Sequence, residues 1–269
     1  MAAVYAAKGR PSFNPLIAHV ADVAGARRIA RFDARAEALA ARFWPGPLTL
    51  VLPAGDPQAV CDLARAGLDT VAVRAPAHPL AHRLLEMFGG PLVAPSANRS
   101  GRPSPTTFGD AVEETGAAAA EALDGGACRI GLESTVVGLV DVPRLLRPGA
   151  VTRGEIEAVI GPLAEAELDA RRSPGRLARH YAPDLPLRLE ADAPRPGEAY
   201  LAFGAAPAGE RVWNLSQARD LQEAAANLFS ALRAADRSGA SAIGVAPIPH
   251  DGLGEAINDR LRRAAGFVG

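Results

Sequence analysis

The stretch PLVAPSANRSGRPSPTT, residues 91–107, sets the organisation of the chain because it joins a short apolar run to a long polar loop. Residues 91–94 are typical of the end of a buried strand, and two further prolines and a glycine prevent a helix or strand after Pro95. The loop is rich in hydroxyl, amide and backbone N–H groups, which hold phosphate, carboxylate or ribose in proteins. Since ligands in open α/β sheets bind beyond the carboxyl ends of strands, we expect a ligand site here, with an ordinary polar surface loop as the alternative.

The segments before this loop alternate strands with helices. Three strands and one amphipathic helix are predicted, at residues 16–20, 48–52, 70–74 and 32–43. The helix ends at Trp44, which we expect to be a packing anchor. Arg74 stands at the carboxyl end of its strand, at the rim where Ser96 is expected, so we predict that it binds a ligand, with a surface ion pair as the alternative.

An Ala-rich helix opens the chain and ends at Gly9, just before a proline. Lys8 and Arg10 flank this glycine and could grip a phosphate or a carboxylate. The alternative is a solvated helix end, where Lys and Arg are favoured by the helix dipole. Asn14 and His19 lie on or beside the same turn, so they join the candidate polar residues.

The sequence pattern in the second half of the chain predicts a further, smaller α/β domain. A strand over 132–137 carries Ser134 near its beginning, and residues 173–183 have the composition of a linker that nevertheless contains the pair His180-Tyr181. Further strands and helices are predicted at residues 153–160, 198–203, 211–215, 220–237, 242–246 and 253–265. Beyond the linker the order β, β, α, β, α suggests a parallel core.

Composition excludes several classes of protein. The chain has 269 residues, of which 48% are hydrophobic and 22% charged, as in globular proteins. The net charge of −1 argues against a strongly basic nucleic-acid binder. Cys61 and Cys128 belong to no CxxC or Cys/His cluster, so we predict neither a disulfide framework nor a zinc site. With no signal peptide and no apolar run near the roughly 18 residues of a membrane span, we predict a cytoplasmic location and no membrane contact.

Several motifs in a fixed order resemble the YrdC-like family of threonylcarbamoyl-AMP synthases, in its longer two-domain form. The matching stretches are KGRPSFNPLIAHV (8–20), FWPGPLTLVL (43–52), TVAVRAPAHP (70–79), PLVAPSANRSGRPSPTT (91–107), ESTVVGL (133–139), RPGAV (147–151), SPGRLARHYAP (173–183) and GLGEAINDRLRRAA (252–265). The resemblance therefore runs nearly end to end.

The resemblance implies the fold, the domains and the reaction. It implies an α/β fold, with a YrdC-like open twisted mixed sheet with helices over residues 1–165, a linker over 166–185 and a small Rossmann-like α/β domain over 186–269. The implied reaction converts L-threonine, bicarbonate and ATP to threonylcarbamoyl-AMP and pyrophosphate. The product would pass to the machinery that makes threonylcarbamoyladenosine in tRNA, and a weak RNA contact is an accompanying expectation.

The resemblance also implies residue roles. Lys8, Arg10 and Arg74 would be catalytic. Contacts to ATP are implied for Arg10, Asn14, Thr70, Ser96, Ser104, Arg147 and Tyr181, with Tyr181 closing over the nucleotide as a lid. Threonine would be held by His19, Arg74, Ala94 through its backbone, and Ser134.

The chemistry of these residues agrees with that division. Arg74 suits a bidentate bond to a carboxylate, whereas Ser96 and Ser104 offer donors to phosphate. No side chain resembles a covalent nucleophile, which suits attack of a threonine-derived carbamate on the α-phosphorus of ATP. Positioning and charge neutralisation by Arg, Lys and a magnesium ion would supply most of the catalysis, and no protein metal site is predicted.

One departure from the family pattern and two alternatives stay open. The family begins with a strand and a PTETVYGL-like segment, whereas this sequence starts inside the following helix, so we expect part of the threonine pocket to be missing and the activity to suffer. The main alternative is a non-catalytic nucleotide- or double-stranded-RNA-binding protein of the same fold. A carbamoyl-transfer domain of hydrogenase maturation would need zinc-finger and acylphosphatase-like modules, which the cysteine pattern and length exclude.

Overall fold

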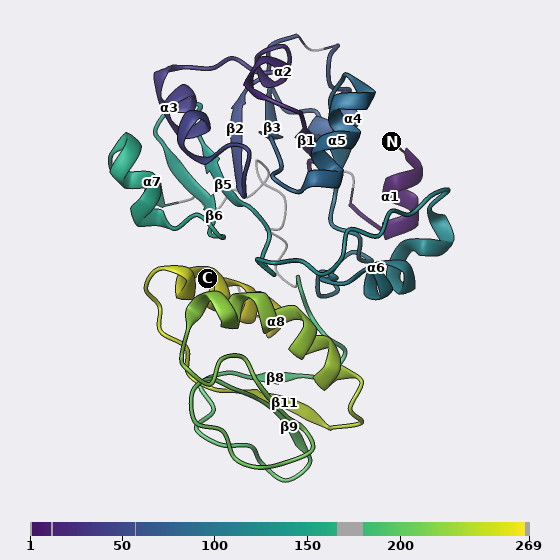
Figure 1. The fold of residues 1–269 in the computed structure, drawn as a ribbon, viewed down its shortest axis with the longest axis vertical. Coiled ribbons are helices and arrows are strands. Elements are labelled where there is room, and N and C mark those ends of the chain that lie inside the picture. Colours follow the sequence, from purple (N-terminus) through teal and green to yellow (C-terminus); the bar gives the residue numbers. More distant parts are fainter. Residues whose placement is uncertain (1, 12, 57, 166–179, 267–269) are drawn as a thin grey trace. The chain divides into compact units, whose positions relative to one another are not determined.

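The computed structural model describes residues 2–11, 13–56, 58–165 and 180–266. The chain forms two compact units (Figure 1). The first unit contains Met1–Pro95 and Glu133–Arg176, and the second contains Ser96–Leu132 and Leu177–Gly269. Each unit is an α/β structure, which confirms the predicted fold class. The second unit takes in residues 96–132, which the predicted domain boundaries place with residues 1–165, and most of the predicted linker lies outside the described residues.

The first unit is built on a mixed sheet with the strand order β4-β1-β3-β2-β5-β6-β7. Its strands are β1 (Ile17–His19), β2 (Leu48–Pro53), β3 (Thr70–Arg74), β4 (Leu92–Ala94), β5 (Thr135–Gly138), β6 (Arg144–Arg147) and β7 (Ala164–Glu165). β3 runs parallel to β1 and antiparallel to β2, and β2 runs parallel to β5. The strands expected near residues 16–20, 48–52 and 70–74 are confirmed. The strand expected over 132–137 starts later, at Thr135, so Ser134 directly precedes it.

The described part of the first unit contains six helices: α1 (Ala2–Lys8), α2 (Val23–Arg27), α3 (Ala34–Phe43), α4 (Asp62–Arg65), α5 (Pro79–Phe88) and α7 (Arg153–Ile160). The side chains of Asp22 and Asp33 cap α2 and α3 by accepting hydrogen bonds from backbone N–H groups. Thr152 and Glu155 form a capping box at the start of α7. Trp44 is confirmed as a packing anchor, because its ring meets Phe32 edge-on at 6.1 Å and its Nε1 donates to the Leu48 carbonyl.

The two faces of this sheet carry different side chains. One face forms the large core, to which α2, α3, α4 and α7 contribute side chains such as Ala26, Leu39, Ala64 and Ile156. The other face carries only a small apolar cluster, made of Ile17, Val51, Ala72 and Val136 with Leu146 packed against it. Because successive side chains of a strand point to opposite faces, any polar residue in register with this small cluster lies on the same face.

The strand before the polar loop differs from its prediction. β4 is an edge strand that pairs with β1 and has no second neighbour among the described strands. Leu92 and Val93 are half-buried and Ala94 is exposed, so the expectation of a buried strand end is wrong. The apolar run Pro91–Ala94 is too short to reveal which position in the sheet it takes, since edge and central strands share the same local pattern.

The second unit has a parallel sheet with the order β10-β9-β11-β8. Its strands are β8 (Leu187–Arg188), β9 (Glu198–Ala202), β10 (Val212–Asn214) and β11 (Ala242–Val245), and its helices are α6 (Phe108–Thr115), η1 (Gly116–Ala118), α8 (Leu221–Asp236) and α9 (Leu253–Ala264). α8 lies along the sheet (Figure 1) and places Leu228, Phe229 and Leu232 in the core. The parallel core expected beyond the linker is confirmed; the two-residue strand β8 was not predicted, because it is too short to show a pattern.

Gly149 lies where the backbone that follows β6 passes the start of β5. A Cβ at this position would come within 2.5 Å of the Thr135 nitrogen and 2.6 Å of the Glu133 oxygen, which are backbone atoms and cannot move aside cheaply. The neighbouring Thr135 hydroxyl donates to the Val151 carbonyl at 2.6 Å and accepts from the Val151 N–H at 3.0 Å, so this crossing also fixes the entry to α7.

We expect Gly149→Ala to destabilise the protein by about 1–3 kcal/mol, because the methyl group overpacks a site bounded by backbone. Gly154→Ala is the matched control, since a Cβ there meets nothing within 4 Å and Gly154 lies in the first turn of α7. Urea unfolding of the three proteins measures the difference. A Gly149→Ala variant as stable as Gly154→Ala would contradict the assigned crossing.

Candidate functional site

The polar residues of the first unit gather on the face of the sheet that carries the small apolar cluster. His19 is paired with Arg74 across β1 and β3, next to the pair Ile17 and Ala72. Thr70 lies two and four residues before Ala72 and Arg74, so all three point to one face. The strand register therefore brings His19 and Arg74 together and places Thr70 on the same face, at the other end of β3.

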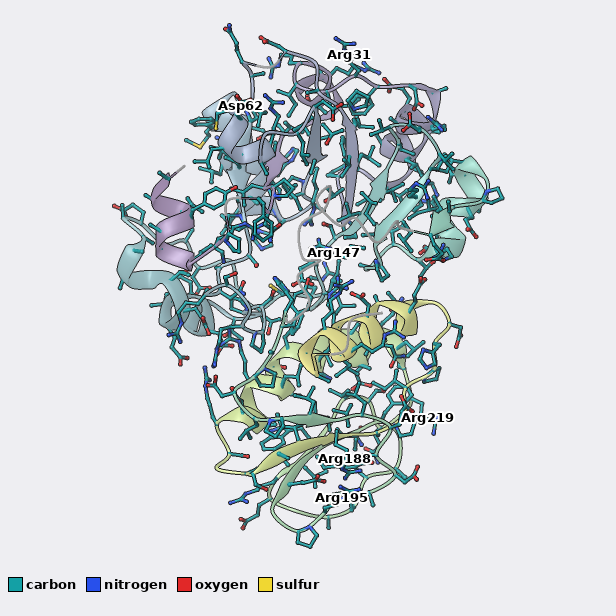
Figure 2. All side chains as sticks on the ribbon, turned by 180° about the vertical axis from the view of Figure 1, so that it is seen from behind. Arg31, Asp62, Arg147, Arg188, Arg195 and Arg219 are labelled. Atoms are coloured by element: carbon teal, nitrogen blue, oxygen red, sulfur yellow. The ribbon has the colours of Figure 1, made fainter. Side chains whose placement is uncertain are left out.

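The same reasoning adds residues from β2, β5 and β6. Val51 pairs with Ala72, and Thr49, two residues earlier, pairs with Val136. Val136 in turn pairs with Arg147, which is labelled in Figure 2. We call His19, Thr49, Thr70, Arg74 and Arg147 the polar face of the first unit.

Arg74 and Arg147 put two guanidinium groups on this face. Arg74 is half-buried, and its Nε donates to the Gly46 carbonyl at 2.9 Å. Burial, and then the nearby Arg147 charge, lower the pKa of Arg74 to about 10, so the group stays protonated at neutral pH. No carboxylate within the described ranges forms an ion pair with either arginine, so the expected alternative of a surface ion pair is wrong for Arg74.

Arg147 is almost fully buried and is held by Ser134. Its Nε and one terminal nitrogen donate to the Ser134 carbonyl at 3.1 and 2.8 Å, and the same terminal nitrogen lies 3.1 Å from the Ser134 hydroxyl. The Ser134 hydroxyl also shares a 2.7 Å hydrogen bond with the Thr49 hydroxyl. Three groups from β2, β6 and the residue before β5 thus form one connected polar network.

Two cations that neutral carbonyl groups hold in place form a site for an anion. Burial of charge is costly unless the charge is paired, and carbonyl oxygens compensate only part of that cost. An incoming carboxylate or phosphate would supply the missing negative charge, with the bidentate geometry that a guanidinium favours. The arrangement is therefore suited to binding a negatively charged group.

His19 is a neutral residue beside these cations. Burial first, and the Arg74 charge second, lower the pKa of His19 to about 4, so the imidazole is uncharged at neutral pH. Its Nδ1 is buried and has no hydrogen-bond partner within the described ranges. A ligand hydroxyl or amine could bond to this nitrogen without a change in the charge of the ring.

Asn14 and Arg10 lie in the turn that leads into β1. Arg10 donates from Nε to the Asn14 carbonyl at 3.2 Å and from a terminal nitrogen to the Pro15 carbonyl at 2.8 Å. The side chain of Asn14 is buried, yet neither its Nδ2 nor its Oδ1 has a hydrogen-bond partner among the described residues. Unsatisfied buried amides are rare and call for an explanation, which a bound ligand would provide.

Other predicted residues lie as follows. Lys8 is buried at the end of α1, so a solvated helix end is not the correct interpretation for it. Thr70 is buried at the opposite end of β3 from Arg74, and Ala94 is the exposed last residue of β4. The described part of the chain thus places the predicted residues of the first unit at both ends of β3 rather than at one point.

Ser96, Ser104 and Tyr181 belong to the second unit. Ser104 is buried, whereas Ser96 is half-buried. Tyr181 has a left-handed backbone with a φ of 64° and is fully buried, with its ring 5.5 Å from Phe229 and under the Arg260 guanidinium. Tyr181 is thus a core residue of the second unit in this structure, and its role as a lid stays a prediction.

The residues do not fit a magnesium ion held by the protein. Among the described residues, no three His, Cys, Asp or Glu side chains come together as metal ligands. The polar face presents cations and hydroxyl groups, whereas magnesium prefers carboxylate and phosphate oxygens. Likewise, no helix in the described part of the chain is long and apolar enough to cross a membrane.

Sequence reasoning missed Thr49 and the Gly46 carbonyl. The alternation of residues 48–52 carried a signal for Thr49, because a polar side chain between Leu48 and Leu50 must point to the face opposite theirs. No signal marked Gly46, since a backbone carbonyl becomes a ligand for Arg74 only through the fold.

Two family models match consecutive parts of the chain. Residues 1–149 match the Sua5/YciO/YrdC model, which is described as telomere recombination. Residues 151–266 match the model described as the C-terminal domain of threonylcarbamoyl-AMP synthase.

Individual relatives are similar over nearly the whole chain. Threonylcarbamoyl-AMP synthase of Pyrococcus abyssi is 40% identical over 98% of this chain and 84% of its own length. The enzyme of that name in Bacillus subtilis is 39% identical over 98% of this chain and 82% of its own length. The crystal structure of Pyrococcus abyssi Sua5 complexed with L-threonine superposes with a TM-score of 0.89 at 39% identity, over 98% of this chain and 84% of that one. The chain therefore belongs to the Sua5/YciO/YrdC family, among the two-domain members that carry the threonylcarbamoyl-AMP synthase C-terminal domain.

Proposed function

We propose that this protein is an L-threonylcarbamoyl-AMP synthase, a nucleotidyltransferase that uses threonine and ATP and serves tRNA modification. The observation that carries the proposal is the pair of arginines on the polar face, which offers an anion site with no carboxylate paired to it within the described residues. Relatives that match nearly the full chain, such as those of Pyrococcus abyssi and Bacillus subtilis, are named threonylcarbamoyl-AMP synthases, and Pyrococcus abyssi Sua5 was crystallised with L-threonine.

Arg74, His19 and Ser134 are assigned to threonine. The guanidinium of Arg74 would bind the threonine carboxylate, because a bidentate pair fixes both its position and its orientation. Neutral His19 and the Ser134 hydroxyl would bond to the threonine hydroxyl or amine, and the backbone of Ala94 is assigned to the same ligand. Since His19 carries no charge, it adds no second cation beside the amine that must react.

Arg10, Asn14, Thr70, Ser96, Ser104, Arg147 and Tyr181 are assigned to ATP. The assignment of Asn14 is supported by its two side-chain amide atoms, which have no hydrogen-bond partner in the described part of the chain. Lys8 and Arg10 would neutralise charge on the phosphates during the reaction. Magnesium would arrive on the ATP phosphates as part of the substrate.

The reaction requires positioning more than it requires a reactive side chain. Bicarbonate and the threonine amine would form a carbamate with loss of water, and a carbamate oxygen would attack the α-phosphorus of ATP while pyrophosphate leaves. Protein cations stabilise the charge that spreads over the phosphate oxygens, and the aligned reactants lower the barrier by pre-arranged geometry. The product would be consumed by a transferase that modifies tRNA.

The decisive test is pyrophosphate release that depends on both threonine and bicarbonate, with threonylcarbamoyl-AMP identified by chromatography and mass. A non-catalytic nucleotide-binding protein of the same fold would bind ATP without releasing pyrophosphate. Binding of double-stranded RNA without turnover would favour a non-catalytic RNA-binding protein of the same fold.

Replacing Arg74 tests the carboxylate assignment. We expect Arg74→Ala to weaken threonine binding by about 1.5–3 kcal/mol, or roughly 10–150-fold, because a charged hydrogen-bond partner is lost. Isothermal titration with threonine and with ATP separately measures the effect, which should fall mainly on threonine. Arg83→Ala, which removes an exposed arginine that pairs with Glu86 on α5, is the control. Equal threonine affinity in both variants would reject the assignment.

The environment of His19 predicts a dependence of stability on pH. The pKa of His19 is about 4 in the folded protein and about 6.5 in an unfolded chain. Between these values the unfolded state binds a proton that the folded state does not, so stability falls as the pH drops from about 6.5 toward 4. At pH 5 this loss amounts to about 2 kcal/mol relative to pH 7.5.

Urea unfolding of the wild type and His19→Gln at both pH values isolates this contribution, because the other titrating groups are common to both proteins. We expect the wild type to lose about 2 kcal/mol more than the variant between pH 7.5 and pH 5. A loss of the same size in the two proteins would mean that His19 has an ordinary pKa.

A further inference from the structure

The polar loop that begins at Ser96 belongs to the same compact unit as the C-terminal α/β domain. This loop carries Ser96 and Ser104, to which the proposed function assigns contacts with ATP. Its conformation must therefore be explained by groups of the second unit, and a small set of buried charges on α6 and α8 provides that explanation.

Glu114 is the centre of this set. It lies on α6 with a side chain that is only 2% exposed. Its Oε2 accepts a hydrogen bond from the Arg99 backbone N–H at 3.0 Å, and its Oε1 lies 3.0 Å from a terminal nitrogen of Arg233. Burial raises the pKa of Glu114, but the Arg99 N–H and the Arg233 charge outweigh it, so the net pKa is lowered and the carboxylate is ionised at neutral pH.

Arg233 connects this carboxylate to the loop itself. It lies on α8, is 4% exposed, and the nitrogen that bonds to Glu114 also donates to the Pro103 carbonyl at 2.6 Å. Pro103 directly precedes Ser104. One nitrogen of α8 therefore fixes the backbone beside a residue that is assigned to ATP.

A second attachment holds the middle of the loop. Arg102 pairs with Asp184 at 2.5 Å and with Asp236, the last residue of α8, at 3.4 Å. The Gly101 carbonyl accepts a hydrogen bond from the Ala182 N–H at 2.7 Å. Both attachments join the loop to residues that follow it by 80 positions or more, namely 182, 184 and 236.

Buried ion pairs of this kind add little to the free energy of unfolding, but they restrict the conformation of the backbone that they bind. The desolvation of two charges offsets much of their attraction, whereas the loss of one partner leaves the other charge buried and uncompensated. The backbone groups that Glu114 and Arg233 bind have few alternative partners in a segment without helix or strand. The pair therefore selects one loop conformation.

We propose that Glu114 and Arg233 are positioning residues, through which the C-terminal domain holds the Ser96–Ser104 loop in its ATP-binding conformation. This proposal rests on the proposed function. It assigns to the C-terminal domain a direct part in nucleotide binding, by way of α8.

The test uses the full chain with two substitutions that remove one charge each. Glu114→Gln keeps the size of the side chain, and Arg233→Met keeps an unbranched side chain that fills part of the same space without a charge or a donor. We expect each to raise the dissociation constant and the KM for ATP roughly 10–100-fold, since small displacements of positioning groups have effects of this size. Threonine affinity should stay within about twofold, because the residues assigned to threonine belong to the first unit, and kcat at saturating ATP should change less than KM.

Arg237→Met is the matched control. Arg237 lies at the end of the same helix and pairs with Asp110 and Glu113. Its replacement therefore removes a similar charge without the loss of a contact to the Ser96–Ser104 loop. Arg233→Lys tests rescue, because a single ammonium group can donate to both the Pro103 carbonyl and Glu114. It should recover a large part of the ATP affinity, and amide exchange over residues 96–107 should be fast in Arg233→Met and slow in Arg237→Met.

Folded Glu114→Gln and Arg233→Met variants that bind ATP like Arg237→Met would overturn the proposal. If neither folds, Arg102→Met decides, since Arg102 is a quarter exposed and holds the same loop to α8; unchanged ATP affinity there would also overturn it. Direct ATP titration separates this outcome from failure of the proposed function, which would show as a wild type that binds ATP but releases no pyrophosphate.

Discussion

Alternation of side chains along β1, β3, β2 and β5 is the constraint on which the rest of the first unit depends. One set of positions is apolar and builds the large core with α2, α3, α4 and α7. The other set supplies a small apolar cluster and, around it, the residues of the polar face. A shift of one residue in register would exchange the two sets, so the pairing that stabilises the core also fixes the position of every polar side chain.

The polar face lowers the stability of the fold, and burial of apolar side chains in the core must offset this loss. Arg74 and Arg147 are cations in or near the interior, and within the described residues their bonds go to carbonyl and hydroxyl oxygens rather than to carboxylates. Asn14 adds a buried side-chain amide that no described residue hydrogen-bonds. A protein under selection for stability alone would pair or remove such groups, and the proposed ligands would supply the missing partners.

The buried carboxylates Glu114 and Asp236 of the second unit, in contrast, are paired with arginines. Glu114 is surrounded by donors from Arg99 and Arg233, and Asp236 accepts from Arg102 and from two backbone N–H groups. Both carboxylates are paired with arginines, so these residues are suited to fixing backbone rather than to binding a ligand. The contrast between matched and unmatched charges separates structural from functional residues on physical grounds.

The family, the presence of two α/β units and most helices and strands could be predicted from the sequence, because local patterns and motifs carry that information. A ligand-binding role was predicted for Arg74 from its place at a strand end, whereas the roles predicted for Ser134 and Arg147 came from the family resemblance. Other features depend on contacts between residues that are distant in sequence. Thr49 forms a hydrogen bond with Ser134, 85 positions away, and Glu114 forms one with Arg233, 119 positions away. The same holds for the edge position of β4 and for the grouping of residues 96–132 with the C-terminal domain. No local pattern encodes which distant partner a buried charge or strand will find, so these features became visible only once the chain was folded.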